Sequence, residues 1–487
     1  MNTNNLKRFA QNARRKLMEQ VAARLEFILT TDSPILREKG RQIEELKKDL
    51  QQTGKAQLIE KVAYTWFNRL VALRYMDAND YQPSGIRVIT PAEGFVLPQA
   101  LNEAKQGHIP EMWRVNRQHI FDLLDGRIPS ANAQNEVFRE LLMAACNHLN
   151  TVFPFLFERI DDYTELLLPD DLTSQFSVVH DVVEGMADED CSQVEVIGWL
   201  YQFYISEEKD RLINAKKKYK PSEIAPVTQL FTPNWIVRYM VDNTLGQLWK
   251  EIKPNTRLSQ SLEFYIKPAD EDLIPERASK SPEEITFFDP CCGSGHILVY
   301  AFDVFYKIYE ELGYNPSEIP GLIITKNLVG IDIDDRAAQL AGFALMMKGR
   351  KQYSRFLRKP VIPNIMSLQN IENDRLFENA KELGSLIKVD QEYLDEIRVD
   401  ENSLFGSLDK QKKRQAEVLS KKYDLVVTNP PYLNSSLMSD TLKQYVDKNY
   451  RDSKSDLFAC FILQASNLTK KDGFIGYISP YVWMFIS

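Results

Sequence analysis

The segment Ile285–His296, with the sequence ITFFDPCCGSGH, indicates the fold class of this chain. An apolar run ends in an acid, a glycine-rich turn follows, and an apolar helical pattern begins after it, which predicts a strand, a turn and a helix. Gly293 and Gly295 let the backbone approach a ligand closely, and the start of the helix favours a negatively charged group. A dinucleotide-binding fingerprint would need a glycine where Leu298 stands and an acid about 20 residues further on, whereas Asp332 lies well beyond that. The turn therefore disfavours a nicotinamide cofactor, and a tight turn without a ligand remains the alternative.

Strands and helices alternate on both sides of this turn. We expect strands over 285–288, 328–331, 425–427 and 474–478, and helices over 297–312 and 336–348. Such alternation predicts a parallel sheet with helices on both faces. Residues from about 371 to 420 are charged and helix-prone with few apolar positions, so we expect a helical insertion on the surface.

The chain before this region has a mostly helical pattern. Apolar residues recur at helical spacing over 59–76, 137–153 and 194–205. The basic stretch 216–221 ends in proline and is most simply a solvated linker, and contact with phosphates is the alternative. We therefore predict a mostly helical domain over 1–225, followed by an α/β domain over 226–487.

The composition is that of a soluble globular protein, with 44% hydrophobic and 26% charged residues among 487. The net charge of -8 means that any contact with nucleic acid needs a local basic patch. No apolar run reaches the roughly 20 residues that span a bilayer. The five cysteines form no CxxC pair or Cys/His cluster, so we expect no disulfide framework, no metal site and a cytoplasmic protein.

A carboxylate ends the second expected strand, in Gly330-Ile331-Asp332-Ile333-Asp334. An acid at the carboxyl edge of a parallel sheet, beside a glycine turn, can accept both ribose hydroxyls of a nucleoside-bearing cofactor. Asp332 is the better candidate because it is closer to the strand. Asp334 could instead cap the helix that follows.

The sharpest signal is Asn429-Pro430-Pro431-Tyr432, which follows the strand at 425–427. Two prolines fix the backbone and remove two N–H donors. The Asn429 side-chain oxygen and the Pro430 carbonyl remain as acceptors, with the Tyr432 ring beside them. Such a cluster suits a planar amino group, whose nitrogen lone pair is exposed for attack on an electrophilic carbon when both hydrogens are held. A simple proline turn is the alternative.

A further helix start lies upstream, at Phe231-Thr232-Pro233. Thr232 is expected as the N-cap and Pro233 as the first helical residue. A carboxylate could dock at that helix end.

These motifs occur in the order Phe231-Thr232-Pro233, Asp289–Gly295, Gly330-Ile331-Asp332 and Asn429–Tyr432, and the set resembles adenine-N6 DNA methyltransferases. The helical start, with Thr65–Leu70 and Ala72–Met76, is similar more narrowly to PglX-type methyltransferases of BREX phage-defence systems.

The resemblance implies a Rossmann-like S-adenosylmethionine-dependent methyltransferase domain that transfers a methyl group to adenine N6 in double-stranded DNA, for phage defence or host DNA modification. The catalytic residues would be Asn429, Pro430 and Tyr432. The residues implied at the cofactor are Phe231, Thr232, Pro233, Asp289, Pro290, Cys291, Gly293, Ser294, Gly295, Asp332, Ile333 and Asn429. Other phage-defence proteins are possible partners, and a membrane is not expected.

The chain departs from this family in two respects. The family often has an acid after its third strand that reads the cofactor's adenine amino group, and the corresponding stretch here, Asn364–Asn370, has none. The chain also stops at the apolar run Tyr481–Ser487, where such enzymes continue into further strands and a target-recognition region. We therefore expect an amino-terminal piece of a longer protein, with weak or absent sequence-specific methylation by itself.

Two other functions stay open from the sequence. One is methylation of another planar nitrogen, in an RNA base or a protein glutamine, because those enzymes use similar Asn-Pro-Pro-Tyr strands. The other is a non-catalytic defence scaffold that binds DNA or a partner protein.

Overall fold

The computed structural model describes residues 2–158, 163–269, 275, 277–397 and 406–481. The chain divides into two compact units, residues 1–204 with 357–360, and residues 205–356 with 361–487. The division falls within helix α9 (Glu195–Asn214). The boundaries expected from the sequence stay a prediction.

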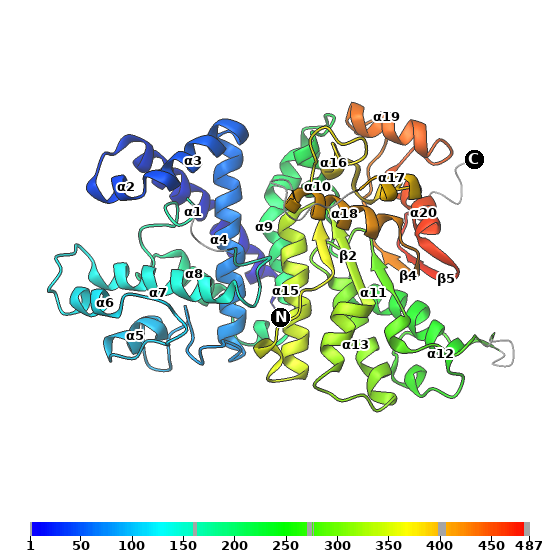
Figure 1. Cartoon of the computed structure of the whole chain (residues 1–487), viewed down its shortest axis with the longest axis horizontal. Helices are drawn as coiled ribbons and strands as arrows, with labels where there is room; N and C mark the ends of the chain where they lie inside the picture. The colour runs from blue at the N-terminus through cyan, green and yellow to red at the C-terminus, as the bar shows by residue number, and fades with distance from the viewer. Residues whose placement is uncertain (1, 159–162, 270–274, 276, 398–405, 482–487) are drawn as a thin grey trace. The chain divides into compact units, whose positions relative to one another are not determined.

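The first unit is helical, and no strand is assigned among its described residues. Its helices are α1 (Thr3–Thr30), α2 (Pro34–Glu38), α3 (Gly40–Thr53), α4 (Lys55–Ala78), α5 (Gln99–Lys105), α6 (Arg117–Leu124), α7 (Ala133–Leu149), α8 (Val178–Gly185) and the start of α9. The long helix α4 contacts α1, α3 and α8, and it is buried over most of its length (Figure 1). The three helical stretches expected from apolar spacing correspond to α4, α7 and α9.

A buried carboxylate ties the end of α4 to the loop after it. Asp77 is fully buried and accepts the backbone N–H groups of Val88, Ile89 and Thr90, each at 2.9 Å. The Gln82 side chain also donates to it, at 2.8 Å. Because these donors are buried and need an acceptor, the Asp77 side chain holds the loop 82–90 against the helix.

The second unit is built on a five-stranded sheet in the order β3-β2-β1-β4-β5. The strands are β1 (Phe287–Asp289), β2 (Leu328–Asp332), β3 (Ile365–Ser367), β4 (Tyr423–Thr428) and β5 (Thr469–Tyr477). All neighbouring pairs are parallel, as the alternating pattern predicted. Strand β3 was not among the strands expected from the sequence, because Ile365-Met366-Ser367 gives only two apolar residues and no longer apolar run.

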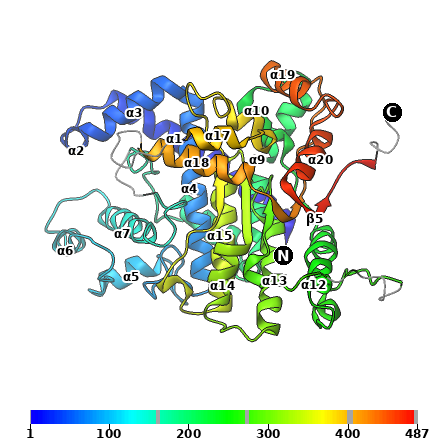
Figure 2. The ribbon, with the colours of Figure 1, turned by 45° about the vertical axis from the view of Figure 1, so that its right-hand side comes forward.

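Helices cover both faces of this sheet. They are α10 (Pro221–Thr228), α11 (Asn234–Val241), α12 (Gln247–Ile252), α13 (His296–Glu311), α14 (Ile319–Leu322), α15 (Asp335–Gln352), α16 (Ala380–Leu383), α17 (Gln391–Glu396), α18 (Gly406–Ser420), α19 (Asp440–Asn449) and α20 (Leu457–Leu468). Helices α13 and α15 contact β2 (Figures 1 and 2), and a side chain at Gly330 would meet Leu298 of α13. The neighbours of this glycine, Val329 and Ile331, point the other way and belong to a core with α18 and α20.

The insertion between β3 and β4 is not the surface excursion that we expected. Phe377, Leu386, Tyr393 and Ala416 are buried and pack in the same core as the sheet. The apolar positions are sparse because short helices each contribute only one or two of them. Residues 398–405 of the insertion lie outside the described part of the chain.

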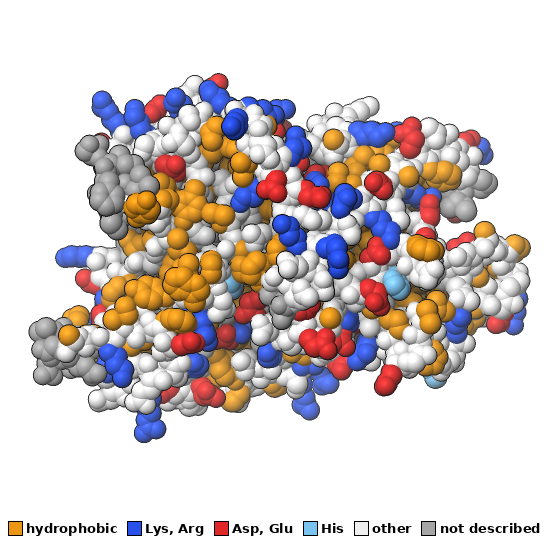
Figure 3. All heavy atoms as spheres, turned by 180° about the vertical axis from the view of Figure 1, so that it is seen from behind, with side chains coloured by type: hydrophobic (Ala, Val, Ile, Leu, Met, Phe, Trp, Pro, Cys, Tyr) orange, Lys and Arg blue, Asp and Glu red, His pale blue; other side chains and the backbone are white. Residues whose placement is uncertain are grey.

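The surface mixes charges and apolar groups. On the face shown in Figure 3, described acidic and basic side chains are interspersed, and hydrophobic side chains gather in a broad patch. Helix α11 contacts the edge strand β5, and the side chains of Trp235, Tyr239 and Ile475 on these two elements are exposed. Tyr481 is exposed, and the rest of the apolar run that ends the chain, 482–487, lies outside the described residues. Among the described helices, none combines the length and the apolar character that a bilayer crossing requires.

Candidate functional site

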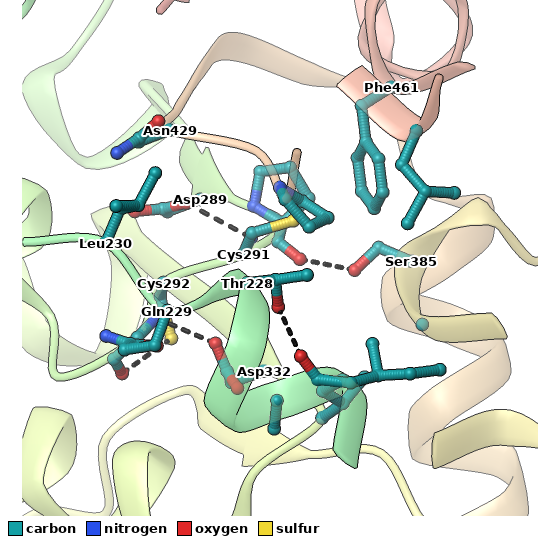
Figure 4. A pocket seen from close by; sticks show the side chains of 18 of the residues that line it. Thr228, Gln229, Leu230, Asp289, Cys291, Cys292, Asp332, Ser385, Asn429 and Phe461 are labelled. Atoms are coloured by element: carbon teal, nitrogen blue, oxygen red, sulfur yellow. Dashed lines mark hydrogen bonds between the residues drawn. The ribbon is translucent and has the colours of Figure 1, made fainter. Parts of the chain in front are cut away.

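A pocket lies where the order of the strands reverses. Strands β1 and β4 are parallel neighbours, with Phe288 opposite Val426, although β2 and β3 lie between them in the sequence. Open α/β sheets bind ligands outside the carboxyl ends of their strands at such a reversal. Here the turn after β1, the residue after β4, the stretch before α11 and part of the insertion line one pocket (Figure 4).

Asp289 ends β1 and is almost fully buried in the pocket wall. Its Oδ1 accepts the backbone N–H of Cys291 at 3.2 Å, and its Oδ2 is buried without a hydrogen-bond partner. Burial raises the pKa of Asp289 to about 7. The neighbouring Thr428 side chain and the Cys291 N–H favour the charged form and so oppose this rise in the pKa. A buried carboxyl with an unused oxygen on a pocket wall is suited to a ligand that donates hydrogen bonds.

The two glycines of the turn have different surroundings. Gly293 lines the pocket with a φ of 51°, and its N–H donates to Asp332 Oδ2 at 2.8 Å. Gly295 has a φ of 84°, and a Cβ there would lie 2.8 Å from the Cβ of Ala341 in α15. The second glycine therefore permits close packing of the turn on α15, and it is not on the pocket wall.

Asp332 is fixed beside the turn by two backbone N–H groups. One comes from Gly293, and the other is that of Asp334, at 2.9 Å from Asp332 Oδ1. Burial raises the pKa of Asp332 to about 6, although the hydrogen bonds from these backbone amides lower the pKa. Asp334 accepts the N–H of Arg336 at 2.9 Å as the N-cap of α15, which confirms the capping role considered for it.

Asn429 follows β4 and lies at the same pocket, with both ends of its amide held. Its Nδ2 donates to Thr232 Oγ1 at 3.1 Å, and its Oδ1 accepts the Tyr432 hydroxyl at 2.9 Å. The Tyr432 hydroxyl also lies 3.1 Å from the Ile478 carbonyl after β5. Since a carbonyl oxygen has two lone pairs, Asn429 Oδ1 can accept one more donor.

Thr232 is not the helix cap that we expected. Helix α11 begins at Asn234 with Pro233 as the N-cap, and no side chain caps it. The Thr232 hydroxyl instead accepts the Asn429 amide, and the side chain is buried. The stretch before α11 thus orients the residue after β4, although they are almost 200 residues apart in the sequence.

Several lining residues were not foreseen from the sequence. Figure 4 shows Gln229 beside the glycine turn, where a Cβ on Gly293 would lie 3.1 Å from its Nε2. His296 also lines the pocket, and its ring stacks on that of the predicted residue Phe231 at a centroid distance of 4.4 Å. From the insertion, Glu382 and Ser385 line the pocket. The Ser385 hydroxyl donates to the Pro290 carbonyl (Figure 4). No motif marks the insertion residues, because they depend on how that segment folds back over the sheet.

The structure brings most of the predicted site residues to this one pocket. Those on its wall are Phe231, Thr232, Asp289, Pro290, Cys291, Gly293, Ser294, Asp332, Ile333 and Asn429. Those predicted but not on the wall are Pro233, Gly295, Pro430 and Tyr432. The roles assigned to all of these residues stay predictions.

Comparison with known sequences finds methyltransferases over the whole chain. Residues 326–487 match the family described as Eco57I restriction-modification methylase. The chain is 37% identical to the adenine-specific methyltransferase BrxX of Escherichia coli O9:H4 (strain HS), in a match that covers 100% of this chain and 47% of that protein. It is 34% identical to the adenine-specific methyltransferase PglX of Lacticaseibacillus casei (strain Zhang), over 99% of this chain and 47% of that protein. These matches confirm the resemblance seen in the motifs.

The chain spans about half the length of these curated relatives. Among solved structures, a DrdV–DNA complex aligns with 99% of this chain and 36% of that chain, with a TM-score of 0.44 and 10% identity.

Proposed function

Because the chain resembles adenine-specific methyltransferases over its whole length, we propose that it binds S-adenosylmethionine and forms the methyl-transferring part of an enzyme that modifies adenine N6 in double-stranded DNA. One observation carries this proposal: the glycine turn, Asp332 and Asn429 line the same pocket. A cofactor site and an amide acceptor for the target amine would then be contiguous. We infer a Rossmann-like methyltransferase fold from the parallel sheet and its reversed strand order.

The residues of the pocket fit this cofactor. The unpartnered Oδ2 of Asp289 offers a buried acceptor for the ammonium group of the methionine end, next to Thr232 and Gly293. Each carboxylate oxygen of Asp332 accepts one backbone N–H and keeps a lone pair for a ribose hydroxyl. When bound, S-adenosylmethionine supplies an electrophilic methyl carbon on a sulfonium.

Asn429 and Pro430 would hold the amino group of the target adenine. Thr232 ties the Asn429 Nδ2, so the oxygen of the amide, and not its nitrogen, is left for the incoming amine. The Pro430 carbonyl is the second acceptor, and together the two would take both N–H hydrogens. The amine lone pair would then be free to form the N–C bond to the methyl carbon as the C–S bond breaks with its electron pair left on sulfur. The methylated nitrogen would then release one of its hydrogens as a proton to solvent.

The target base must leave the duplex to reach this pocket. Flipping costs a few kcal/mol, and one aromatic stack, here on Tyr432, returns about 1–3 kcal/mol. The free energy gained by stacking therefore only balances the cost of flipping the base, and contacts to phosphates must supply the net affinity for DNA. With a net charge of -8, those contacts would come from a local basic surface, here or in further parts of a longer protein. A role in phage defence, with partner proteins of such a system, is inferred from the resemblance alone.

Two experiments test the proposal. Calorimetry of the chain with S-adenosylhomocysteine should show binding at one site, and the absence of binding would favour a non-catalytic scaffold. Tritium transfer from labelled S-adenosylmethionine should go to duplex DNA and appear as N6-methyladenine. Transfer to RNA or to protein glutamine instead would refute DNA as the substrate. The assay uses a protein that contains this chain and has the full length of its curated relatives, because the chain spans about half of that length.

A further inference from the structure

The basic stretch 216–220, with the sequence KKKYK, is fixed on the loop that follows Asn429–Tyr432. Its four lysines are exposed, whereas Tyr219 is 6% exposed and packs in the core of the second unit. The backbone N–H of Tyr219 donates to the Leu437 carbonyl at 3.1 Å. Leu437 belongs to the loop that leads from Tyr432 to α19. The stretch is therefore anchored at Tyr219, and its lysines extend into solvent on both sides of this anchor.

Lysines from two elements lie beside Asp440, the first residue of α19. Lys218 Nζ lies 2.7 Å from Asp440 Oδ1, and both side chains are more than half exposed. The hydrogen bond and the charge of Lys218, and to a lesser extent the charge of Lys443, lower the pKa of Asp440. Lys217 Nζ lies 3.7 Å from Glu223 Oε1. Because the lysines of the stretch and Lys443 outnumber these two carboxylates, together they form a basic surface.

The same two elements reach the pocket. Helix α10 begins directly after the stretch and brings Ile224 and Thr228 to the pocket wall, and α19 brings Leu442. Helix α16 contacts both α10 and α19, and these two helices lie at the same end of the second unit in Figures 1 and 2. The basic surface therefore lies beside the pocket, next to the loop that follows the proposed acceptors of the target amine.

A DNA substrate would need such a surface at this place. The net charge of the chain is -8, so the field of the whole molecule does not attract phosphates. Stacking of a flipped base only balances the cost of flipping, and the remaining free energy comes from phosphate contacts. Exposed ammonium groups make such contacts with release of counterions, and they position the duplex without reading its sequence.

We propose that the basic surface formed by the stretch 216–220 and Lys443 contacts the phosphates of the DNA strand that presents the target adenine. This inference rests on the proposed function. Tyr219 holds the stretch against the loop after Asn429–Tyr432, and Asp440 orients Lys218 and Lys443 toward each other. The lysines thus meet the DNA backbone next to the flipped base.

The test measures the binding of a labelled DNA duplex by fluorescence anisotropy at several salt concentrations. It uses the protein of the methylation assay, with the full length of the curated relatives. Lys217→Gln/Lys443→Gln removes one charge from each element and leaves the pair of Lys218 and Asp440 in place. Each phosphate contact contributes about 0.9 to the slope of log K against log[salt], so the slope should fall by about 2 in magnitude. The affinity at about 0.1 M salt should be at least about tenfold weaker.

Two control variants keep this result specific. Lys326→Gln/Lys351→Gln also removes two exposed charges, but Lys326 precedes β2 and Lys351 is near the end of α15, toward the amino ends of the strands. Lys217→Arg/Lys443→Arg keeps both charges. Both controls should show the salt slope of the wild type. Calorimetry with S-adenosylhomocysteine should give the wild-type affinity for all three variants, because none of these lysines lines the pocket.

The outcomes separate this inference from the proposed function. An unchanged affinity and salt slope of Lys217→Gln/Lys443→Gln would overturn the inference, and methyl transfer to DNA by the same protein would leave the proposed function standing. An equal loss in Lys326→Gln/Lys351→Gln would overturn it as well, because the effect would then belong to total charge and not to this surface. A loss of affinity for duplex RNA but not for duplex DNA would assign the surface to another substrate and overturn it. A wild-type protein that binds no duplex DNA would refute both.

Discussion

The substitution Asn429→Ala tests the proposed chemistry most directly. It removes the amide oxygen that would hold the target amine, while the backbone carbonyl of Pro430 stays. The amide is held in advance by Thr232 at 3.1 Å and by Tyr432 at 2.9 Å, so its contribution is made without reorganisation during the reaction. Loss of one such preorganised contact lowers kcat by about 10²–10³.

A second substitution tests whether Thr232 contributes by orienting the Asn429 amide. Thr232→Val keeps the shape of the side chain but removes the acceptor for Asn429 Nδ2. One neutral hydrogen bond contributes about 0.5–1.5 kcal/mol, which corresponds to a loss of about 2- to 10-fold in kcat if the amide then samples other orientations. The double substitution should cost little more than Asn429→Ala alone, because Thr232 acts through the amide that has been removed.

Single-turnover tritium transfer to duplex DNA at saturating S-adenosylmethionine measures this step. Because the resemblance also implies Asn429 at the cofactor, the concentration of S-adenosylmethionine is saturating for each variant, and an unchanged thermal unfolding curve shows that Asn429→Ala is folded. Turnover of Asn429→Ala within threefold of wild type would refute the assignment. Fully additive losses in the double variant would refute the orienting role of Thr232.

Three further substitutions test the electrostatics and packing of the structure. Burial raises the pKa of Asp289 to about 7, so the folded chain keeps a proton there between about pH 4 and 7, where the unfolded chain has released it. The contribution of this carboxyl to the free energy of unfolding therefore falls as the pH rises from about 4 toward 7. Asp289→Asn should therefore raise the unfolding temperature more at pH 8 than at pH 5, and an equal effect at both would contradict the buried, raised pKa. Gly295→Ala should lower the free energy of unfolding, measured in urea, by about 1–3 kcal/mol, because the φ of Gly295 is 84° and the new Cβ would lie 2.8 Å from that of Ala341. Gly313→Ala is the control for backbone strain alone, because Gly313 has a φ of 76° but open space around it. Asp77→Ala leaves three buried N–H groups unsatisfied and should destabilise the first unit by about 3 kcal/mol or more, and an unchanged thermal unfolding curve would disprove the bracing role of that carboxylate.

The elements with local signals could be predicted from the amino-acid pattern alone. The strand predicted at 285–288, which the structure has at Phe287–Asp289, depends on residues within a few positions of one another, as do the glycine turn and the Asn-Pro-Pro-Tyr stretch. Alternation of strands with helices implied a parallel sheet, because two parallel strands need a crossover between them. The motifs Asp289, Asp332 and Asn429 could therefore be expected at one edge of a sheet, where the structure has them lining one pocket.

Which partner each of these side chains contacts depends on how the whole chain folds. Thr232 has the sequence of a helix cap, yet its hydroxyl accepts the amide of Asn429. Gly295 lies in a motif for ligand approach, yet its missing side chain makes room for α15. Glu382 lies in a charged stretch without a motif, yet it reaches the pocket wall. Local patterns fix backbone conformation through nearest neighbours, whereas these contacts join residues tens to hundreds of positions apart, and only the packing of the whole sheet and its helices brings them together.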